Sequence, residues 1–297
     1  MEETNGRVIW RCNMKVLTSI QNGGSEMYIK RVGNVYIWHF SYLYQSHMGL
    51  FAAYSTSDLV LIALSAFIIG LSKAGLKGID MLNVTIMTIV FGGKASTGIV
   101  LPLLCAADIM AVKYYHRHAQ WPHVIKLIPW MVTGILIGVF AGKDLDEAIF
   151  RKIMATIIVC TVVIMLVIEL RKTMIIPGNK LFVAGMGLVS GITTMLGNLA
   201  GAFSNIYFLA MRLPKNDFIG TGAWIFLLIN FFKLPFQVFY WKNITANSLL
   251  TDLALIPFLV LGFWCGIKLV AKIKDDLYRQ VVIVLTLIGA IFIFLKR

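Results

Sequence analysis

Two long runs without a charged residue constrain the fold more than any other feature of the chain. Residues 153–168 and residues 281–295 contain no Asp, Glu, Lys or Arg. Runs of this length suit helices that cross about 30 Å of hydrocarbon. Of the 297 residues, 59% are hydrophobic and only 14% are charged, against roughly 25% charged residues in a soluble domain. The sequence therefore excludes a soluble enzyme, a disordered chain and a nucleic-acid-binding module, and its continuous runs do not fit the alternating strands of a membrane barrel.

Apolar segments recur from Asp58 onward and predict helices. Two pairs of segments are short, with Lys73–Gly78 inside the first pair and Gly197–Gly201 inside the second. We therefore expect an all-α, polytopic helical membrane protein with about eight spans, six ordinary and two interrupted or re-entrant. The segments are 58–72, 79–91, 95–112, 127–142, 149–168, 181–196, 200–211, 218–240, 249–267 and 279–295.

The chain also resembles itself. Residues 127–152 align without gaps on residues 255–280, with identical Leu, Ile, Pro, Val, Arg and two Gly. We interpret this as a duplication into two transmembrane repeats, 55–172 and 180–297, although chance similarity between apolar helices is the alternative. Interrupted helices at matching places in two halves indicate a transporter binding site.

The orientation of the two repeats depends on the interrupted segments. If each crosses the membrane once, the halves are parallel; if each is a re-entrant hairpin, the halves are inverted. The inverted arrangement gathers more Lys and Arg on the side of the 113–126 loop, which favours it weakly.

The first 47 residues do not follow the helical pattern. They carry basic residues but no apolar core of a secretory signal, and the aromatic stretch 32–44 is too short to span a membrane. We expect a mobile tail, or a translation start misassigned upstream of Met48.

The net charge of +13 arises from 27 basic and 14 acidic residues. Most Lys and Arg lie at the ends of apolar runs, where they set topology and reach the interface. Cys12, Cys105, Cys160 and Cys265 form no C-x-x-C pair, and we interpret them as free thiols. His116, His118 and His123 lie beside Trp121 at a predicted interface, and we expect no metal and no cofactor.

The two breaks are the main candidate site. Half-helix ends expose backbone amides that attract anions, and glycine permits close approach, although tight packing by small residues is the alternative. Lys73 and Lys77 could neutralise an oxyanion, or both could extend to an interface. Thr193, Thr194 and Asn198 could add hydrogen bonds. The candidate substrate-binding residues are Lys73, Gly75, Lys77, Gly78, Gly197, Asn198, Gly201, Asn205 and Thr221.

Two further charges lie within apolar stretches, where a charge is costly. Asp108 and Lys233 occupy similar depths in the two halves. They could form a coupling site for a proton or cation, an anion site, or a structural ion pair. Asp252, near the start of its segment, is expected at the interface.

In order and spacing, these motifs resemble the sulfite exporter TauE/SafE family, also called the sulfonate uptake permease family. The resemblance covers about residues 55–297, and GNLAG departs from the family pattern at Leu199 and Ala200. The motifs are GLSKAGLKG (70–78), TGIVLPLLCAADIMA (97–111), LIPWMVTGILIG (127–138), SGITTMLGNLAG (190–201), RLPKNDFIGTGAW (212–224), INFFKLPF (229–236) and LIPFLVLGFWCG (255–266).

The resemblance implies a multi-pass plasma-membrane transporter of small sulfur-containing anions, driven by an ion gradient. Its partners would be the lipid bilayer and a small anionic substrate, with no nucleic acid, and a homo-oligomer is left open. The alternatives are a membrane scaffold or assembly factor without transport, and a membrane-embedded enzyme, for which the sequence shows no catalytic motif.

Overall fold

The computed structural model describes residues 29–32, 35–38, 54–170 and 180–295. The chain divides into two compact units, Met1–Ala53 and Tyr54–Arg297. In the first unit, β1 (Ile29–Val32) pairs antiparallel with β2 (Val35–Trp38). The sequence predicted no strand there. The remainder of the 1–47 segment, and with it the expected tail or later start at Met48, lies outside the described residues.

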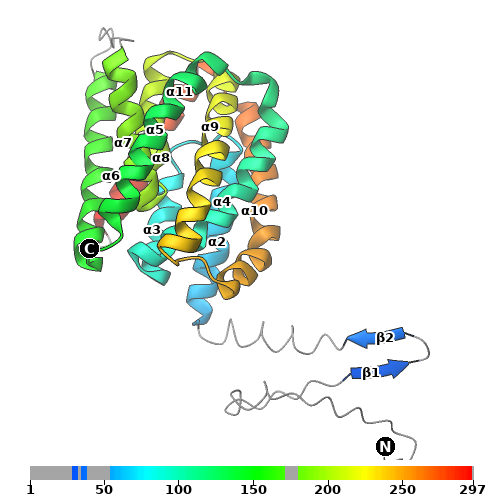
Figure 1. Cartoon of the computed structure of the whole chain (residues 1–297). Coiled ribbons are helices and arrows are strands. Elements are labelled where there is room, and N and C mark those ends of the chain that lie inside the picture. The colour runs from blue at the N-terminus through cyan, green and yellow to red at the C-terminus, as the bar shows by residue number, and fades with distance from the viewer. Residues whose placement is uncertain (1–28, 33–34, 39–53, 171–179, 296–297) are drawn as a thin grey trace, which may run out of the picture. The chain divides into compact units, whose positions relative to one another are not determined.

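The described residues of the second unit form helices joined by short turns (Figure 1). The breaks in the helical pattern fall where the sequence predicted them, after Lys73 and after Gly197. In chain order the elements are α2 (Thr56–Lys73), α3 (Asp80–Phe91), α4 (Gly93–Tyr115), the 3₁₀ turn η2 (His116–His118), α5 (Trp121–Gly142), α6 (Glu147–Leu170), α7 (Lys180–Gly197), α8 (Ala200–Ala210), α9 (Lys215–Pro235), the π-helical turn η3 (Phe236–Tyr240), α10 (Ala246–Lys272) and α11 (Asp275–Leu295).

Polar side chains determine where several helices begin. The Ser55 hydroxyl accepts a hydrogen bond from the Asp58 amide, and the Asp58 carboxylate accepts one from the Ser55 amide, a capping box that starts α2. Thr245 and Ser248 form the same motif before α10. At α4 the cap comes from another helix, because the Glu147 carboxylate accepts hydrogen bonds from the amides of Gly93 and Lys94.

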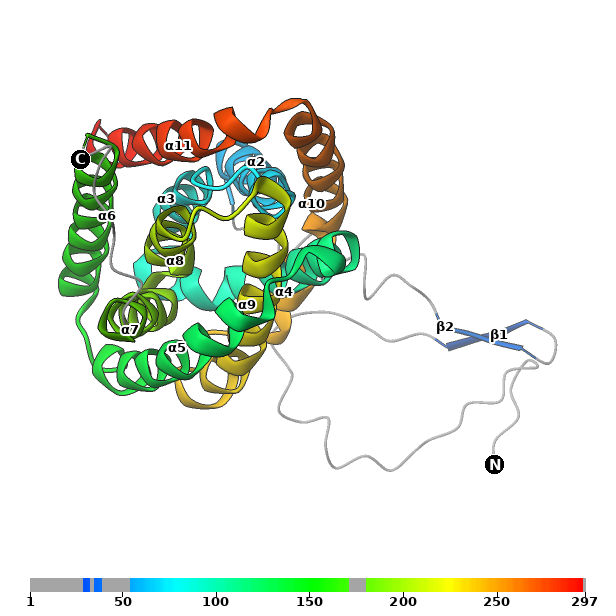
Figure 2. The same cartoon turned by 90° about the horizontal axis from the view of Figure 1, so that it is seen from above.

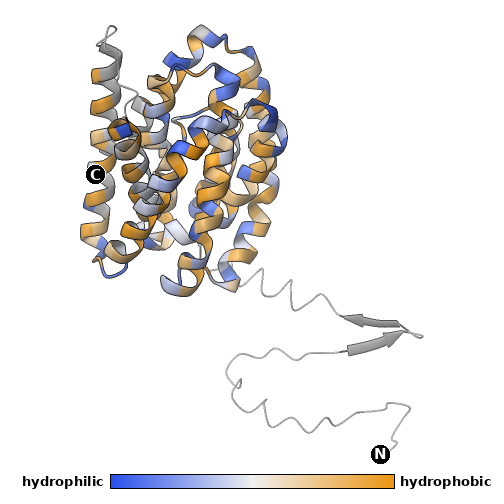
Figure 3. Ribbon diagram, turned by 45° about the horizontal axis from the view of Figure 1, so that its top comes forward, coloured by the Kyte–Doolittle hydropathy of each residue, from blue (hydrophilic) through white to orange (hydrophobic). Residues whose placement is uncertain are grey.

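Six described helical stretches are long and apolar enough to cross a membrane. The two uncharged runs lie in α6 and α11, which are 24 and 21 residues long. Hydrophobic residues line the helices along much of their length, as Figure 3 shows. The predicted all-helical, multi-pass membrane fold is therefore confirmed for the second unit. The six stretches are Thr56–Lys73, Gly93–His118, Trp121–Gly142, Lys180–Gly197, Lys215–Tyr240 and Ala246–Lys272.

At each break the chain turns back on itself. The Ser65 hydroxyl in the middle of α2 donates a hydrogen bond to Asn83 Oδ1 in α3, so α3 runs back alongside α2. In the same way α8 packs beside α7 (Figure 2). We call these pairs the first hairpin (α2–α3) and the second hairpin (α7–α8). Each therefore returns toward the end of the molecule from which it starts.

Glycines hold each hairpin against a distant helix. A Cβ added to Gly262 of α10 would overlap the carbonyl oxygen of Phe67 in α2. Likewise, a Cβ added to Gly134 of α5 would overlap the carbonyl oxygen of Leu188 in α7. Only a residue without a side chain permits these backbones to come so close. The first hairpin is thus packed against α10 and the second against α5.

The helices connect at two ends of the second unit. One end, which we call the basic end, contains the turns around 116–120, 211–214 and 273–274, and the opposite end contains the turns around 92, 143–146 and 241–245. Lys215 links two turns of the basic end, since its Nζ is 2.6 Å from the Ile273 carbonyl oxygen. At the opposite end, the Trp241 indole donates a hydrogen bond of 3.0 Å to the Val139 carbonyl. Helices α4 and α9 run between the two ends and pack against each other.

Candidate functional site

The first break is shaped by two glycines and held by two tyrosines. Gly75 has φ 125° and Gly78 has φ 98°, conformations that L side chains rarely adopt. The Tyr115 hydroxyl donates a hydrogen bond of 2.9 Å to the Ala74 carbonyl, and the Tyr278 hydroxyl donates one of 2.6 Å to the Gly75 carbonyl. These bonds tie the carbonyls just after α2 to two other helices and fix the segment that carries Lys77.

The second break is centred on Asn198, which has φ 56°. Asparagine tolerates this left-handed conformation better than most residues. Its side-chain amide donates a hydrogen bond of 2.9 Å to the Thr97 carbonyl in α4. The amide oxygen of Asn198 is thereby turned toward Lys233, whose Nζ is 2.6 Å away.

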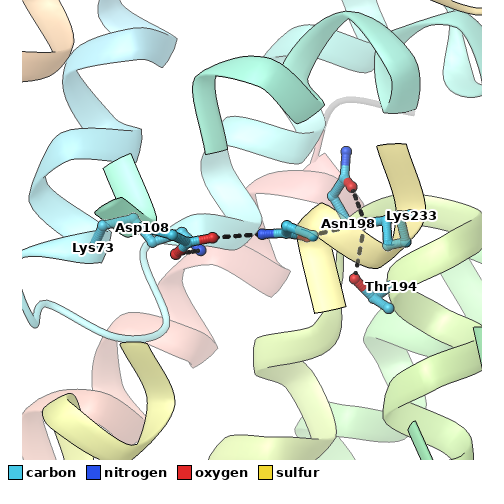
Figure 4. A network of polar contacts seen from close by, with 6 residues as sticks. Lys73, Asp108, Thr194, Asn198 and Lys233 are labelled. Atoms are coloured by element: carbon cyan, nitrogen blue, oxygen red, sulfur yellow. Dashed lines mark hydrogen bonds and ion pairs between the residues drawn. The ribbon is translucent and has the colours of Figure 1, made fainter. Parts of the chain in front are cut away.

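A chain of polar contacts joins the two hairpins across α4 and α9 (Figure 4). Lys73 Nζ is 2.6 Å from Asp108 Oδ1, and both residues are buried. The other carboxylate oxygen of Asp108 accepts a hydrogen bond of 2.6 Å from Asn230. Lys233 then donates to Asn230 Oδ1 at 3.3 Å and to Thr194 Oγ1 at 3.1 Å. The network therefore runs from α2 through α4 and α9 to α7.

A small cavity lies where the two hairpins meet. Its free volume is about 30 Å³, enough for about two water molecules. The first hairpin contributes the cations of Lys73 and Lys77 to its wall, and the second contributes amide and hydroxyl groups. The lining residues are Ser72, Lys73, Lys77, Asp80, Asn83, Val84, Leu104, Thr194, Asn198, Ala200, Gly201, Phe226 and Asn230.

Lys77 differs from the other buried lysines in its partners. It is only 2% exposed, and among the described residues it forms no hydrogen bond or ion pair through its ammonium group. The ring of Phe226 lies beside it, with the centroid 5.3 Å from Lys77 Nζ and 4.7 Å from Lys73 Nζ. A cation–π contact compensates only part of the cost of burying a charge. An anion in the cavity would supply the missing counter-charge.

The charges around the cavity leave an excess of cations. Lys73, Lys77 and Lys233 are opposed by Asp108 and by Asp80, whose Oδ1 accepts a hydrogen bond of 2.9 Å from the Gly78 amide. Only Lys73 and Asp108 form a direct ion pair among these five. The N-terminus of α8, with Ala200 and Gly201 in the cavity wall, adds the positive end of a helix dipole. The site can therefore stabilise one small anion better than a cation.

The structure brings some of the predicted site residues together and leaves others apart. Lys73, Lys77, Asn198 and Gly201 line the cavity, whereas Gly75, Gly78, Gly197, Asn205 and Thr221 are not among its lining residues. Side chains of Ile219 and Thr286 occupy the space beside Gly75 and Gly78, as the alternative of tight packing expects. The Thr221 hydroxyl accepts a hydrogen bond from the Gln120 amide at 2.9 Å, near the basic end.

Burial and distance bear on two of the alternatives that the sequence left open. Lys73 and Lys77 do not extend to an interface, since they are 8% and 2% exposed. The partner of Asp108 is Lys73 and not Lys233, because Asn230 lies between Asp108 and Lys233.

Three side chains outside the cavity also differ from simple surface residues. Asp252 is 5% exposed, and neither of its carboxylate oxygens has a hydrogen-bond partner among the described residues. Asn205 is buried, and its side-chain oxygen has no hydrogen-bond partner in the part of the chain that the structure describes. His123 Nδ1 lies 2.6 Å from the Tyr207 hydroxyl. Cys105, Cys160 and Cys265 are free thiols, while Cys12 is outside the described residues.

Sequence reasoning missed Asn230, Asp80, Asn83 and Phe226. Asn230 had a usable signal, because it precedes Lys233 by three residues and so shares its helix face. Asp80 also had a signal, because it is an acidic residue directly after the first break, where the next helix begins. Phe226 had none, since it is one of many apolar residues in α9.

The fold and the cavity define a class: a multi-pass helical membrane protein with two broken hairpins that enclose a cationic, partly polar cavity. The model of the sulfite exporter TauE/SafE family matches residues 62–293. The chain belongs to this family, whose members are membrane transporters and not enzymes. Searches among curated proteins and among solved structures found no match.

Proposed function

We propose that the protein is a secondary transporter or exporter of a small sulfur-containing anion, such as sulfite or a sulfonate, and that the anion binds in the cavity between the hairpins. The observation that carries this proposal is Lys77, a buried ammonium group that faces the cavity and has no hydrogen-bonded or ion-paired partner within the described part of the chain. Family membership supports the class of substrate. Hydrogen bonds from Asn198 and Thr194 would orient the oxyanion, while Lys73 and Lys77 balance its charge.

The proposed architecture is two inverted repeats, 55–172 and 180–297. Six helices (α4, α5, α6, α9, α10 and α11) would cross the membrane, and the two hairpins would be re-entrant. The glycine contacts support this relation. Gly134 and Gly262 are 128 residues apart, which is the offset of the sequence repeat. Each of them packs against the hairpin of the other half. The reversal of the chain within each hairpin supports the inverted orientation.

The cavity between the hairpins has a free volume of about 30 Å³, room for about two water molecules. Substrate would enter by separation of the hairpins from α4 and α9, first at one end of the molecule and then at the other. Contacts on both sides of the cavity support such alternation. Tyr115 and Tyr278 hold the first break toward the basic end, and the Asn198 side chain holds α4 toward the opposite end through Thr97.

The Lys73–Asp108–Asn230–Lys233 network would link substrate to a coupling ion. An anion that approaches Lys73 competes with Asp108 for the same ammonium group. Release of Asp108 would then create a site for a proton or cation, so that the buried charge stays balanced. The plasma membrane is the expected location, with the basic end toward the cytoplasm according to the distribution of Lys and Arg.

The direct test is transport by the purified protein in proteoliposomes. Uptake of ³⁵S-labelled sulfite, kept free of oxygen, should exceed that of protein-free vesicles. Lys77→Met and Asn198→Ala should each lower it at least about tenfold, because each removes a contact to the bound anion. Lys152→Met is the matched control. Lys152 is exposed and lies in α6, which contributes no residue to the cavity wall.

Two results would contradict the proposal. Uptake equal to that of empty vesicles, for sulfite and for a panel of sulfonates, would refute transport of this substrate class. Uptake unchanged in both variants would move the binding site away from the cavity. Co-purification of a protein partner, without any flux, would favour the scaffold function instead.

A further inference from the structure

A second pocket opens at the basic end, outside the cavity between the hairpins. Its volume is about 540 Å³, far larger than that cavity. Its charged residues are Arg212, Lys215, Arg279 and Asp275. Lys215 Nζ lies 3.4 Å from Asp275 Oδ1 in an ion pair, so the two arginines supply the excess positive charge of the pocket. The lining residues are Leu209, Arg212, Leu213, Pro214, Lys215, Phe218, Asp275, Tyr278 and Arg279.

Arg212 occupies a backbone position that favours glycine. Its φ is 53°, and its amide donates to the Leu209 carbonyl while the Leu213 amide donates to the Phe208 carbonyl. This pattern closes the C-terminus of α8, where Gly is the usual residue. The Arg212 side chain itself is exposed at the pocket.

Two sets of protein contacts link this pocket to the cavity between the hairpins. Tyr278 lines the pocket and also bonds the Gly75 carbonyl in the first break. Helix α8 starts in the wall of the cavity at Ala200 and ends beside the pocket, so its 11 residues set a separation of about 16 Å. Lys215 also lines a neighbouring pocket of about 330 Å³ that contains Tyr115, the residue bonded to the Ala74 carbonyl.

From these contacts we infer that the pocket around Arg212 is a vestibule that binds the substrate anion before it passes Tyr278 into the cavity. The inference rests on the proposed function. A concentration of positive charge at a concave entrance raises the local concentration of an anion, and the effect falls with ionic strength. The ligand of the vestibule is a small oxyanion. Such a group is present both in the substrate, as sulfite or a sulfonate, and in a lipid, as the headgroup phosphate. We assign the vestibule to the substrate.

The structure offers a variant that removes the charge without harming the fold. Arg212→Gly deletes the guanidinium and places glycine where the backbone already has positive φ, which favours the native conformation. Lys242→Gly is its matched control. Lys242 is also exposed, basic and at positive φ, 55°, but it follows η3 at the opposite end of the molecule.

The measurement is equilibrium exchange of ³⁵S-labelled sulfite in proteoliposomes of neutral lipid. In this assay each protein molecule binds sulfite from both sides of the membrane, so its orientation in the vesicle does not matter. Arg212→Gly should raise the half-saturating sulfite concentration about threefold or more at roughly 10 mM salt, where the screening length is about 30 Å. The difference should shrink in high salt, and the maximal exchange rate should stay unchanged. Asp275→Asn should shift the half-saturating concentration in the opposite direction, because it removes the opposing charge from the pocket.

Three outcomes would overturn the inference. Equal half-saturating concentrations in Arg212→Gly and Lys242→Gly refute the vestibule while leaving transport intact. An effect of Arg212→Gly that requires phosphatidylglycerol in the membrane assigns the pocket to a lipid headgroup. Absence of exchange by the unmodified protein refutes the proposed function itself, and the vestibule is refuted with it.

Discussion

Asp108 Oδ1 lies 2.6 Å from Lys73 Nζ in an ion pair that joins α4 to the end of α2, at the break of the first hairpin. The carboxylate of Asp108 is fully buried, and its second oxygen is bonded by Asn230. Both oxygens thus have a partner, which is the condition under which a buried charge is tolerated. The pair positions the ammonium group of Lys73 at the cavity.

Removal of either partner should destabilise the protein strongly. Asp108→Leu and Lys73→Leu should each lower the free energy of unfolding by about 3–5 kcal/mol, because each leaves an uncompensated buried charge. The double variant should recover most of this loss. Thermal unfolding in detergent measures the effect, and Asp144→Leu, at an exposed position, is the control. Full additivity of the two single losses would contradict the pairing.

Lys77 should show the opposite relation between stability and function. Lys77→Met removes a buried ammonium group that has no hydrogen-bonded or ion-paired partner among the described residues, so thermal stability should stay equal or rise. Sulfite uptake should nevertheless be lost. A variant that unfolds more readily than the unmodified protein would mean that Lys77 contributes to the fold and not to anion binding.

The close helix contacts predict sharp differences among glycine substitutions. Gly262→Ala and Gly134→Ala should each destabilise by about 2 kcal/mol or more, because a Cβ would overlap backbone of the adjacent hairpin. Gly185→Ala, in α7, should be neutral or slightly stabilising, since no atom of the described residues lies within 4 Å of its added Cβ and alanine favours the helix. Similar unfolding temperatures for all three would refute the close packing.

The two tyrosines of the first break should each contribute about 1 kcal/mol through one hydrogen bond. Tyr115→Phe and Tyr278→Phe retain the rings and remove only the hydroxyls that bond the carbonyls of Ala74 and Gly75. Because these carbonyls are adjacent, the losses should not add, and a double-mutant cycle on the unfolding free energy would reveal coupling. Tyr114→Phe, half exposed, is the control.

Much of the helical framework followed from the sequence, because apolar runs and glycine breaks are local signals. The run 95–112 lies inside α4 (Gly93–Tyr115), and the segment 249–267 lies inside α10 (Ala246–Lys272). The ends of the helices were less accessible, since the caps depend on partners such as Glu147, which is far from α4 in sequence.

The candidate site could be predicted only in its parts. The breaks indicated Lys73, Lys77 and Asn198, each of which lines the cavity. The partner of Asp108 could not be predicted, because it depends on how α2 packs against α4. Similar depth in the two halves suggested Lys233, which the structure separates from Asp108 by the amide of Asn230.

The contact between α2 and α10 also sets an order for biosynthesis. The first hairpin is made before α10, and Gly262, which packs against Phe67, follows Phe67 by 195 residues in the chain. Until then, the lysines of the first hairpin lack the helix that holds them in place, and the nascent chain must keep two costly ammonium groups out of lipid. Release of a chain truncated before α10 would therefore yield a quality-control substrate and not a smaller transporter.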